Sequence, residues 1–273
     1  MYSNRHFFLT GCAGGIGGHL VEALAKQNAN IFATDFDSDA LHRRVDESRW
    51  PSDRVTLQAL DVRDPEAWER VFQEAVDKLG TIDVAMNIAG CLFANWAVDA
   101  PREQVDLQFD VNVKGVIFGT QVAARHMLSR AQGHIINIAS MASLAPIPGL
   151  SVYCATKYAV RAFSIAAAHE LRPKGVHVSV VCPDTVRTDL WKGQWKREET
   201  RLAFSGRRVL TVEDVTRIIL GRVLTKKSLL TFFPASRGLL ARAADLFPAS
   251  GGFLLPSLME RGRIKQTEFK DET

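Results

Sequence analysis

The glycine cluster TGCAGGIG at residues 10–17 follows directly on the short apolar run at residues 5–9. That run predicts a strand, and the apolar positions of residues 16–27 recur at helical spacing, so the glycines lie between a strand and a helix. Glycine tolerates positive φ and has no Cβ to block a bound group, and the N-terminus of a helix is electropositive. This context indicates a phosphate-binding loop rather than a plain tight turn.

Strands and helices alternate through the first two-thirds of the chain. Further strands are expected at residues 31–34, 55–60, 84–87, 135–139, 176–182 and 228–233, and further helices at residues 65–79, 104–130, 152–171 and 211–224. The strands are almost continuously apolar, which is typical of buried parallel strands. We therefore expect an α/β fold, with residues 1–236 forming one doubly wound parallel sheet of the Rossmann type.

The C-terminal part follows this pattern less closely. Residues 189–208 are charged and irregular and are expected to form a lid over the substrate, whereas residues 237–273 form an extension with short helical pieces at 237–247 and 253–259. Residues 201–273 contain 13 Lys/Arg against 7 Asp/Glu. A basic, apolar extension is compatible with peripheral contact with a membrane. Packing on the sheet edge or on a second subunit is favoured over that alternative.

Bulk properties narrow the class of protein. The net charge of +4 is too small to indicate a nucleic-acid partner. The four cysteines, at positions 12, 91, 154 and 182, lack the C-x-x-C spacing of zinc or redox motifs, so we expect no metal. No secretory signal and no run of 18 apolar residues is present, and the sequence predicts a cytoplasmic protein.

An acidic residue at the end of the second strand extends the glycine-loop hypothesis. Asp35 lies 18 residues after Gly17, where a carboxylate can accept the ribose hydroxyls of NAD. The same carboxylate would repel the 2′-phosphate of NADP. No Lys or Arg lies at residues 12–17 or at position 36 to neutralise such a phosphate. NAD is therefore favoured over NADP.

A tyrosine and a lysine supply a candidate for proton transfer. Tyr153 precedes Lys157 by four residues in the predicted helix, so both side chains lie on one face. A phenol with its ordinary pKa near 10 is a poor acid–base group at neutral pH, and a neighbouring cation favours the phenolate. No other charged residue lies within residues 153–160. We expect a buried, reactive pair rather than a surface pair.

At this point the chain resembles the short-chain dehydrogenase/reductase family over about residues 5–190. The glycine loop matches the family pattern T-G-x-x-x-G-x-G, and Ser140 lies thirteen residues before Tyr153, as the family's active-site serine does. The remaining matches are the helix-borne Asn112, the pair Asp61-Val62, the segment Asn87-Ile88-Ala89-Gly90 and the segment from Pro183 to Thr188.

The resemblance implies hydride transfer between a secondary alcohol, or its ketone, and a nicotinamide ring. It gives catalytic roles to Tyr153 as acid and base, to Lys157 and Ser140 as its partners, and to Asn112 as the anchor of a water on the proton route. Thr188 is expected to bind the carboxamide. The expected cofactor contacts are Gly11, Gly15, Ile16, Gly17, Asp35, Asp61, Val62, Asn87, Ala89, Gly90, Tyr153, Lys157 and Thr188.

Three positions depart from the family pattern. Ile88 replaces a second Asn, Asp184 replaces the Gly after Pro183, and Asn28 replaces a Gly before the second strand. Asn28 is expected to adopt the left-handed conformation that Gly would supply. Asp184 lies near the expected nicotinamide end and is the departure of greatest consequence.

The predicted substrate is a hydrophobic alcohol or ketone. The residues expected around it, Cys91, Leu92, Phe93, Met141, Leu144, Pro146, Ile147 and Pro148, are overwhelmingly apolar, with Trp191, Trp195 and Phe204 in the lid and Ser143 as a further contact. The family implies a homodimer or homotetramer. The alternative to an enzyme is a catalytically silent, regulatory nicotinamide-binding protein, which would not need the four catalytic residues together.

Overall fold

The computed structural model describes residues 2–247 and 251–267, and its centre is a parallel sheet. The strand order is β3-β2-β1-β4-β5-β6-β7. Because the chain moves outward from β1 in one direction and then from β4 in the other, the sheet is doubly wound, as predicted. The strands are β1 (His6–Thr10), β2 (Asn30–Asp35), β3 (Val55–Ala59), β4 (Val84–Asn87), β5 (Gly133–Ile138), β6 (Val176–Pro183) and β7 (Leu230–Phe233).

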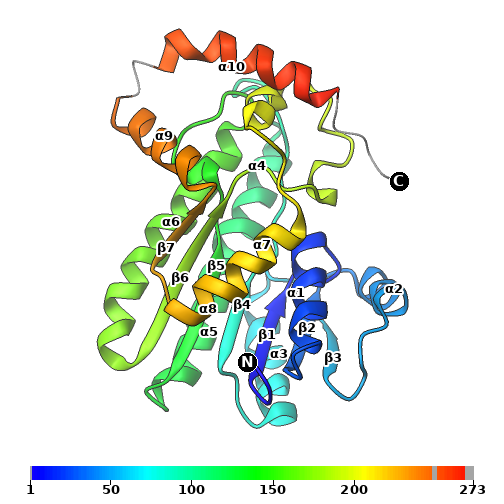
Figure 1. Ribbon diagram of the computed structural model, residues 1–273. Coiled ribbons are helices and arrows are strands. Elements are labelled where there is room, and N and C mark those ends of the chain that lie inside the picture. The colour runs from blue at the N-terminus through cyan, green and yellow to red at the C-terminus, as the bar shows by residue number, and fades with distance from the viewer. Residues whose placement is uncertain (1, 248–250, 268–273) are drawn as a thin grey trace.

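Helices cover both faces of the sheet (Figure 1). They are α1 (Gly15–Ala25), α2 (Ser38–Ser48), α3 (Pro65–Leu79), α4 (Arg102–Phe109), α5 (Gly115–Leu128), α6 (Ser151–Leu171), α7 (Val212–Ile218), α8 (Leu224–Lys226), α9 (Ala235–Leu246) and α10 (Gly251–Gln266). A π-helical turn at Asp110–Lys114 joins α4 to α5, and a second at Ile219–Val223 joins α7 to α8. The single helices predicted at 104–130 and 211–224 are thus each interrupted by a π turn.

Successive side chains along the strands point to opposite faces of the sheet, where they belong to two separate hydrophobic cores. Phe7 and Leu9 of β1 point into the core under α1 and α7, whereas Phe8 points to the opposite face. There the Phe8 ring stacks on Phe32 at 5.8 Å and contacts Trp68 of α3 at 5.7 Å, measured between ring centroids. Both faces are therefore apolar, which explains why the strand sequences do not alternate with polar residues.

Local signals in the sequence set several element ends. The Asp64 side chain accepts hydrogen bonds from the backbone N–H groups of the first turn of α3, and Thr211 and Asp214 form the capping box that starts α7. Asn28 has φ of 59°, so it takes the left-handed conformation expected of it. These ends agree with the predictions because their causes are local.

The C-terminal extension packs on the rest of the molecule. Helix α9 lies against β7, where Gly238 contacts the Phe232 ring, and α10 crosses above the carboxyl edge of the sheet (Figure 1). Helix α10 lies on the 3₁₀ segment Glu198–Ser205 of the predicted lid. The predicted piece 253–259 is too short, since the helix continues through Pro256 to Gln266. The predicted break at Pro248 and residues 268–273 lie outside the described residues.

Among the described residues, the helices are all too short or too polar to cross a lipid bilayer.

Candidate active site

A cleft of about 690 Å³ lies over the carboxyl ends of the central strands. Its walls include the loops that follow each of the strands β1 to β6. The strand order reverses between β1 and β4, and ligands of doubly wound sheets bind at such a reversal. The predicted site residues in its lining are Gly11, Gly15, Ile16, Gly17, Asp35, Asp61, Val62, Ala89, Gly90, Ser140, Tyr153, Lys157 and Thr188.

The glycine loop closes tightly at the floor of the cleft. Gly11 has φ of 71°, and a Cβ there would lie 2.9 Å from the Ala89 backbone. A Cβ on Gly17 would lie 2.1 Å from the Gly11 carbonyl oxygen. The first turn of α1 therefore approaches the loop as only a glycine allows. A bound pyrophosphate would lie at the positive N-terminal end of α1.

Asp35 connects the end of β2 with the glycine loop. Its carboxylate accepts hydrogen bonds from the backbone N–H of Ala13 at 3.0 Å and of Asp37 at 3.2 Å. Burial raises the pKa of Asp35, and these N–H groups oppose that rise. The carboxylate also lines the cleft, so it can accept hydroxyl groups of a ribose.

The far end of the cleft is suited to a planar base. Leu60 to Arg63 and Phe36 line the cleft, and Phe36 is 76% exposed. Arg63 pairs with Asp61 at 2.5 Å, and this guanidinium lowers the pKa of the Asp61 carboxyl group. Phe36 and Arg63 were not predicted as site residues. The position of Phe36 directly after the acidic residue of β2 is visible in the sequence and could have indicated it.

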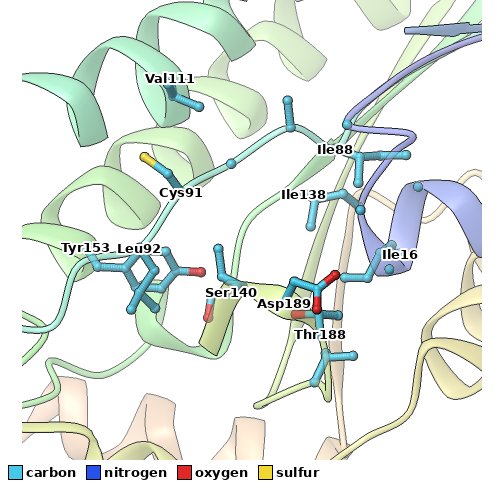
Figure 2. Close-up of a pocket in the computed structure, with 18 of the residues that line it drawn as sticks. Ile16, Ile88, Cys91, Leu92, Val111, Ile138, Ser140, Tyr153, Thr188 and Asp189 are labelled. Atoms are coloured by element: carbon cyan, nitrogen blue, oxygen red, sulfur yellow. The ribbon is translucent and has the colours of Figure 1, made fainter. Parts of the chain in front are cut away.

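Tyr153 and Ser140 face the cleft from different elements (Figure 2). Tyr153 lies in the first turn of α6, and Ser140 follows β5 with its hydroxyl accepting the Ala142 N–H at 3.1 Å. Lys157 lies one turn further along α6, its Nζ 5.6 Å from the Tyr153 ring centroid and 3.1 Å from the Ile138 carbonyl oxygen to which it donates. The predicted triad is thus assembled.

Burial acts on this triad in opposite directions. It raises the pKa of Tyr153, and the Ser140 hydroxyl opposes that rise. It lowers the pKa of Lys157 to about 8. The tyrosine pKa is therefore raised, whereas a lowering by Lys157 was expected. Both shifts favour the neutral phenol and the neutral amine.

Thr188 lies across the cleft from the triad. Its Cγ2 is 3.0 Å from the Cβ position that Gly15 lacks, so it packs on the first turn of α1 (Figure 2). Asp184, in the same loop, is buried and forms an ion pair with Arg237 of α9. The loop after β6 is therefore held by the C-terminal extension, which sequence reasoning did not predict.

The two asparagines predicted for the site lie behind its lining. Asn87 donates to Asn137 Oδ1 at 2.8 Å and to Thr120 at 3.3 Å, and is buried between β4 and β5. Asn112, in the π turn, bonds the N–H and the carbonyl oxygen of Cys91. Its Oδ1 is 3.2 Å, and Lys157 Nζ 3.6 Å, from the missing Cβ of Gly90. The structure thus places Asn112 beside the lysine without a direct bond.

The substrate half of the cleft is mostly apolar. Among the residues predicted for it, Cys91, Leu92, Phe93, Met141, Ile147 and Trp191 line the cleft. Ser143 is fully buried, with its hydroxyl donating to the Ser140 carbonyl at 2.6 Å, so the predicted substrate contact is not available. Trp195 and Phe204 pack with Trp191 in the cluster above the cleft rather than in its lining.

Gln194 joins the predicted lid to the opposite wall. Its Nε2 donates to the Leu92 carbonyl at 2.8 Å, and its Oε1 accepts from the Ala94 N–H at 2.7 Å. This residue lines the cleft and was not predicted. No local pattern signals it, because its partners lie about 100 residues earlier in the chain.

Comparison with known sequences finds one family over most of the chain. The family model described as short chain dehydrogenase matches residues 5–199. The diacetyl reductase [(S)-acetoin forming] of Staphylococcus epidermidis is 33% identical over 184 residues, covering 67% of this chain and 72% of the relative. The 1-deoxy-11-beta-hydroxypentalenate dehydrogenase of Streptomyces exfoliatus is 36% identical over 192 residues, covering 69% and 70%.

A solved structure has the same fold over most of both chains. A short chain dehydrogenase/reductase from Burkholderia phymatum, in complex with NAD, superposes with a TM-score of 0.80 at 25% identity. The match covers 88% of this chain and 92% of that chain. The agreement therefore extends past residue 199, where the family match ends.

Proposed function

The chain belongs to the short-chain dehydrogenase family, and we propose that it is an NAD-dependent oxidoreductase that interconverts a hydrophobic secondary alcohol and its ketone. The observation that carries the proposal is the convergence of Tyr153, Ser140 and Lys157 in one cleft with the glycine loop. A cleft that binds a dinucleotide alone would not need a buried phenol and a buried amine beside each other.

The residues around the glycine loop fit a dinucleotide. Gly11 and Gly17 leave space at the turn, and the Asp35 carboxylate faces the cleft. The bound nicotinamide would accept or supply a hydride. Asp35 favours NAD, because the negative charge would repel a 2′-phosphate. Arg63 would favour NADP, because a guanidinium can pair with a 2′-phosphate. This guanidinium is already paired with Asp61.

Three side chains have separate roles in the reaction of the alcohol. Tyr153 takes the hydroxyl proton during oxidation and returns it during reduction. Ser140 donates a hydrogen bond to the substrate oxygen as negative charge develops there. Lys157 stabilises the phenolate and contacts the nicotinamide ribose. Asn112 supports this pair by holding the backbone of Cys91 next to the lysine.

The lining supports a hydrophobic substrate. Leu92, Ile147 and Trp191 offer apolar surface beside Tyr153. The two relatives described above are named for diacetyl, a diketone, and for a hydroxypentalenate, so each name contains a carbonyl or a hydroxyl group. We propose the same chemical class for this chain. Family membership also supports a homodimer or homotetramer, which light scattering of the purified protein would test.

One assay tests catalysis, cofactor and substrate class together. The purified protein is mixed with NAD or NADP and a panel of lipophilic secondary alcohols, with a polyol and a hydroxy acid as matched polar controls, and absorbance is followed at 340 nm. We expect turnover with lipophilic alcohols and NAD. NADH binding without turnover of any panel member would instead favour the silent, regulatory binding protein.

A further inference from the structure

A buried ion pair joins the active-site loop to the C-terminal extension. Asp184 directly follows Pro183, the last residue of β6, and is 8% exposed. Its Oδ2 lies 2.7 Å from Nε of Arg237 in α9. Burial raises the pKa of Asp184, and the Arg237 guanidinium is the strongest influence that opposes the rise. The carboxylate therefore depends on Arg237 for its charge.

Arg237 also reaches the lid. Its NH2 donates to the hydroxyl of Ser205 at 3.1 Å, and Ser205 is 2% exposed. The next residue, Gly206, lies so close that a Cβ there would be 3.0 Å from the Asp184 carboxylate. One guanidinium thus bridges two segments that are distant in sequence. It comes from a helix beyond the 5–199 segment that matches the family.

The bridged loop contributes directly to the cleft. Asp184, Thr185 and Thr188 line it. The Thr185 hydroxyl donates to the carbonyl oxygen of Ala203 at 2.7 Å, and Ala203 is a lining residue of the lid. The loop and the lid are therefore joined directly by the Thr185 hydrogen bond, and Arg237 bonds both segments from outside the cleft.

We infer that Arg237 is a positioning residue, which acts through Asp184 and Ser205 to fix the loop carrying Thr188 and thereby the nicotinamide end of the bound cofactor. This inference rests on the proposed function, since it assumes that the cleft binds a dinucleotide. Removal of one partner from a buried ion pair leaves the other charge uncompensated, so the loop is expected to rearrange. Among the described residues, no hydrogen bond or ion pair joins Asp184 or Arg237 to the glycine loop or to Asp35.

The test compares a complete cofactor with one that lacks the nicotinamide. Arg237→Met keeps most of the side-chain length and removes the charge. Binding of NADH and of ADP-ribose to the purified full-length variant is measured by titration calorimetry. We expect NADH affinity to fall by about tenfold and ADP-ribose affinity to change by less than about twofold. If Arg237 had a purely structural role, the affinities for NADH and for ADP-ribose would fall together.

Two further variants make the result decisive. Arg242→Met changes the same residue type in the same helix, but Arg242 packs over the Phe232 ring, 5.6 Å from its centroid, so we expect wild-type affinities. The double variant D184N/R237M leaves no lone buried charge, so it should fold even where Arg237→Met does not. It should still lose NADH affinity selectively.

Equal losses for NADH and ADP-ribose, or wild-type NADH affinity in the double variant, would overturn the inference. These outcomes are separate from the failure of the proposed function. A wild-type protein that binds NADH but oxidises no alcohol would refute the proposed function while leaving the positioning role open to the same binding test. A wild-type protein that binds no NADH would overturn both.

Discussion

Tyr153 and Lys157 are buried beside each other, and neither forms an ion pair with another residue in the described part of the chain. The phenol is 7% exposed and the lysine 4%, and the Lys157 Nζ donates to a carbonyl oxygen rather than to a carboxylate. Removal from water disfavours the phenolate and the ammonium alike. Burial therefore favours the neutral phenol and the neutral amine, and an ionised phenol would need the ammonium beside it.

Replacement of the tyrosine hydroxyl tests its role at the level of one atom. Tyr153→Phe removes the group proposed to transfer the proton and keeps the aromatic ring, so we expect kcat to fall by about a thousandfold or more. NADH affinity should stay within about twofold, because the fold and the glycine loop are unchanged. Steady-state rates at 340 nm and an NADH titration measure the two effects. Near-normal turnover in this variant would refute the proton-transfer role.

His134 links the stability of the fold to pH. Its side chain is 1% exposed in β5, Nε2 lies 2.8 Å from the Ser179 hydroxyl, and burial lowers its pKa to about 3. Below pH 6.5 the unfolded chain takes up a proton at this position that the folded protein does not. Stability contributed by the neutral ring is thus present above pH 6.5 and is lost as pH falls toward 3, by up to ~1.4 kcal/mol per pH unit.

Denaturant unfolding between pH 7 and pH 4 measures that slope. His134→Gln retains a polar group near Ser179 but does not titrate, so its free energy of unfolding should fall less steeply with acid than that of the wild type. His169→Asn changes an exposed histidine of α6 and serves as the control with an unchanged slope. If the free energy of unfolding falls equally steeply with pH in the wild type and in His134→Gln, this histidine does not cause the pH dependence of stability.

At the scale of elements, the sheet and the long helices follow from local patterns. The bounds of α3 and β4 are those predicted, because each is a clear apolar run or stripe between strong end signals. Helix α2 was missed, since Leu41 is its one fully buried residue and its sequence has no apolar stripe. It forms because Asp37 caps it and the crossover from β2 to β3 needs a helix.

For helix α10, the sequence predicts a break where the structure has a continuous helix. Gly251, Gly252 and Pro256 predict a broken segment by local rules. The helix nevertheless runs to Gln266, because Gly262 packs on the backbone of Arg201 and the Gln266 amide donates to the Arg197 carbonyl. These contacts are more than 60 residues apart in sequence, so no window of the sequence contains them. Gln194 and Arg237 escaped prediction for the same reason.

The glycine loop allows a test with an internal control. In Gly17→Ala the new methyl group would lie 2.1 Å from the Gly11 carbonyl oxygen, so the turn must open and NADH affinity should fall by about a hundredfold. In Gly14→Ala the nearest atom lies at 3.5 Å and φ is −78°, so affinity should stay near the wild-type value. Calorimetric titration with NADH measures both. Equal losses in the two variants would mean that crowding against the Gly11 carbonyl oxygen does not set the affinity.

At the scale of the whole molecule, the two ends of the cleft have different supports. The end that holds the glycine loop rests on β1, β2 and α1, which lie within the family match at residues 5–199. The end proposed for the substrate is roofed by the segment 189–208, and that roof is covered in turn by α10 (Figure 1). Gln266, 6% exposed, and Lys265 bond the carbonyl groups of Arg197 and Gly206 from above.

Removal of α10 should therefore separate substrate binding from cofactor binding. A chain that ends at residue 250 loses the Gln266 and Lys265 bonds to the roof, so we expect the Michaelis constant for the best lipophilic alcohol to rise by about tenfold. ADP-ribose affinity should be unchanged, because among the described residues no hydrogen bond or ion pair joins α10 to the glycine loop or to Asp35. A chain that ends at Thr267 keeps the helix and is the matched control.

The alternatives give opposite patterns in this experiment. If the extension served only to stabilise the fold, truncation would lower the melting temperature and weaken ADP-ribose and alcohol binding together. If it served only a membrane, kinetics in detergent-free buffer would match those of the full chain. A selective rise of the Michaelis constant, with ADP-ribose binding intact, requires that the C-terminal helix holds the roof of the substrate site, since no other described element covers the segment Glu198–Ser205 as extensively.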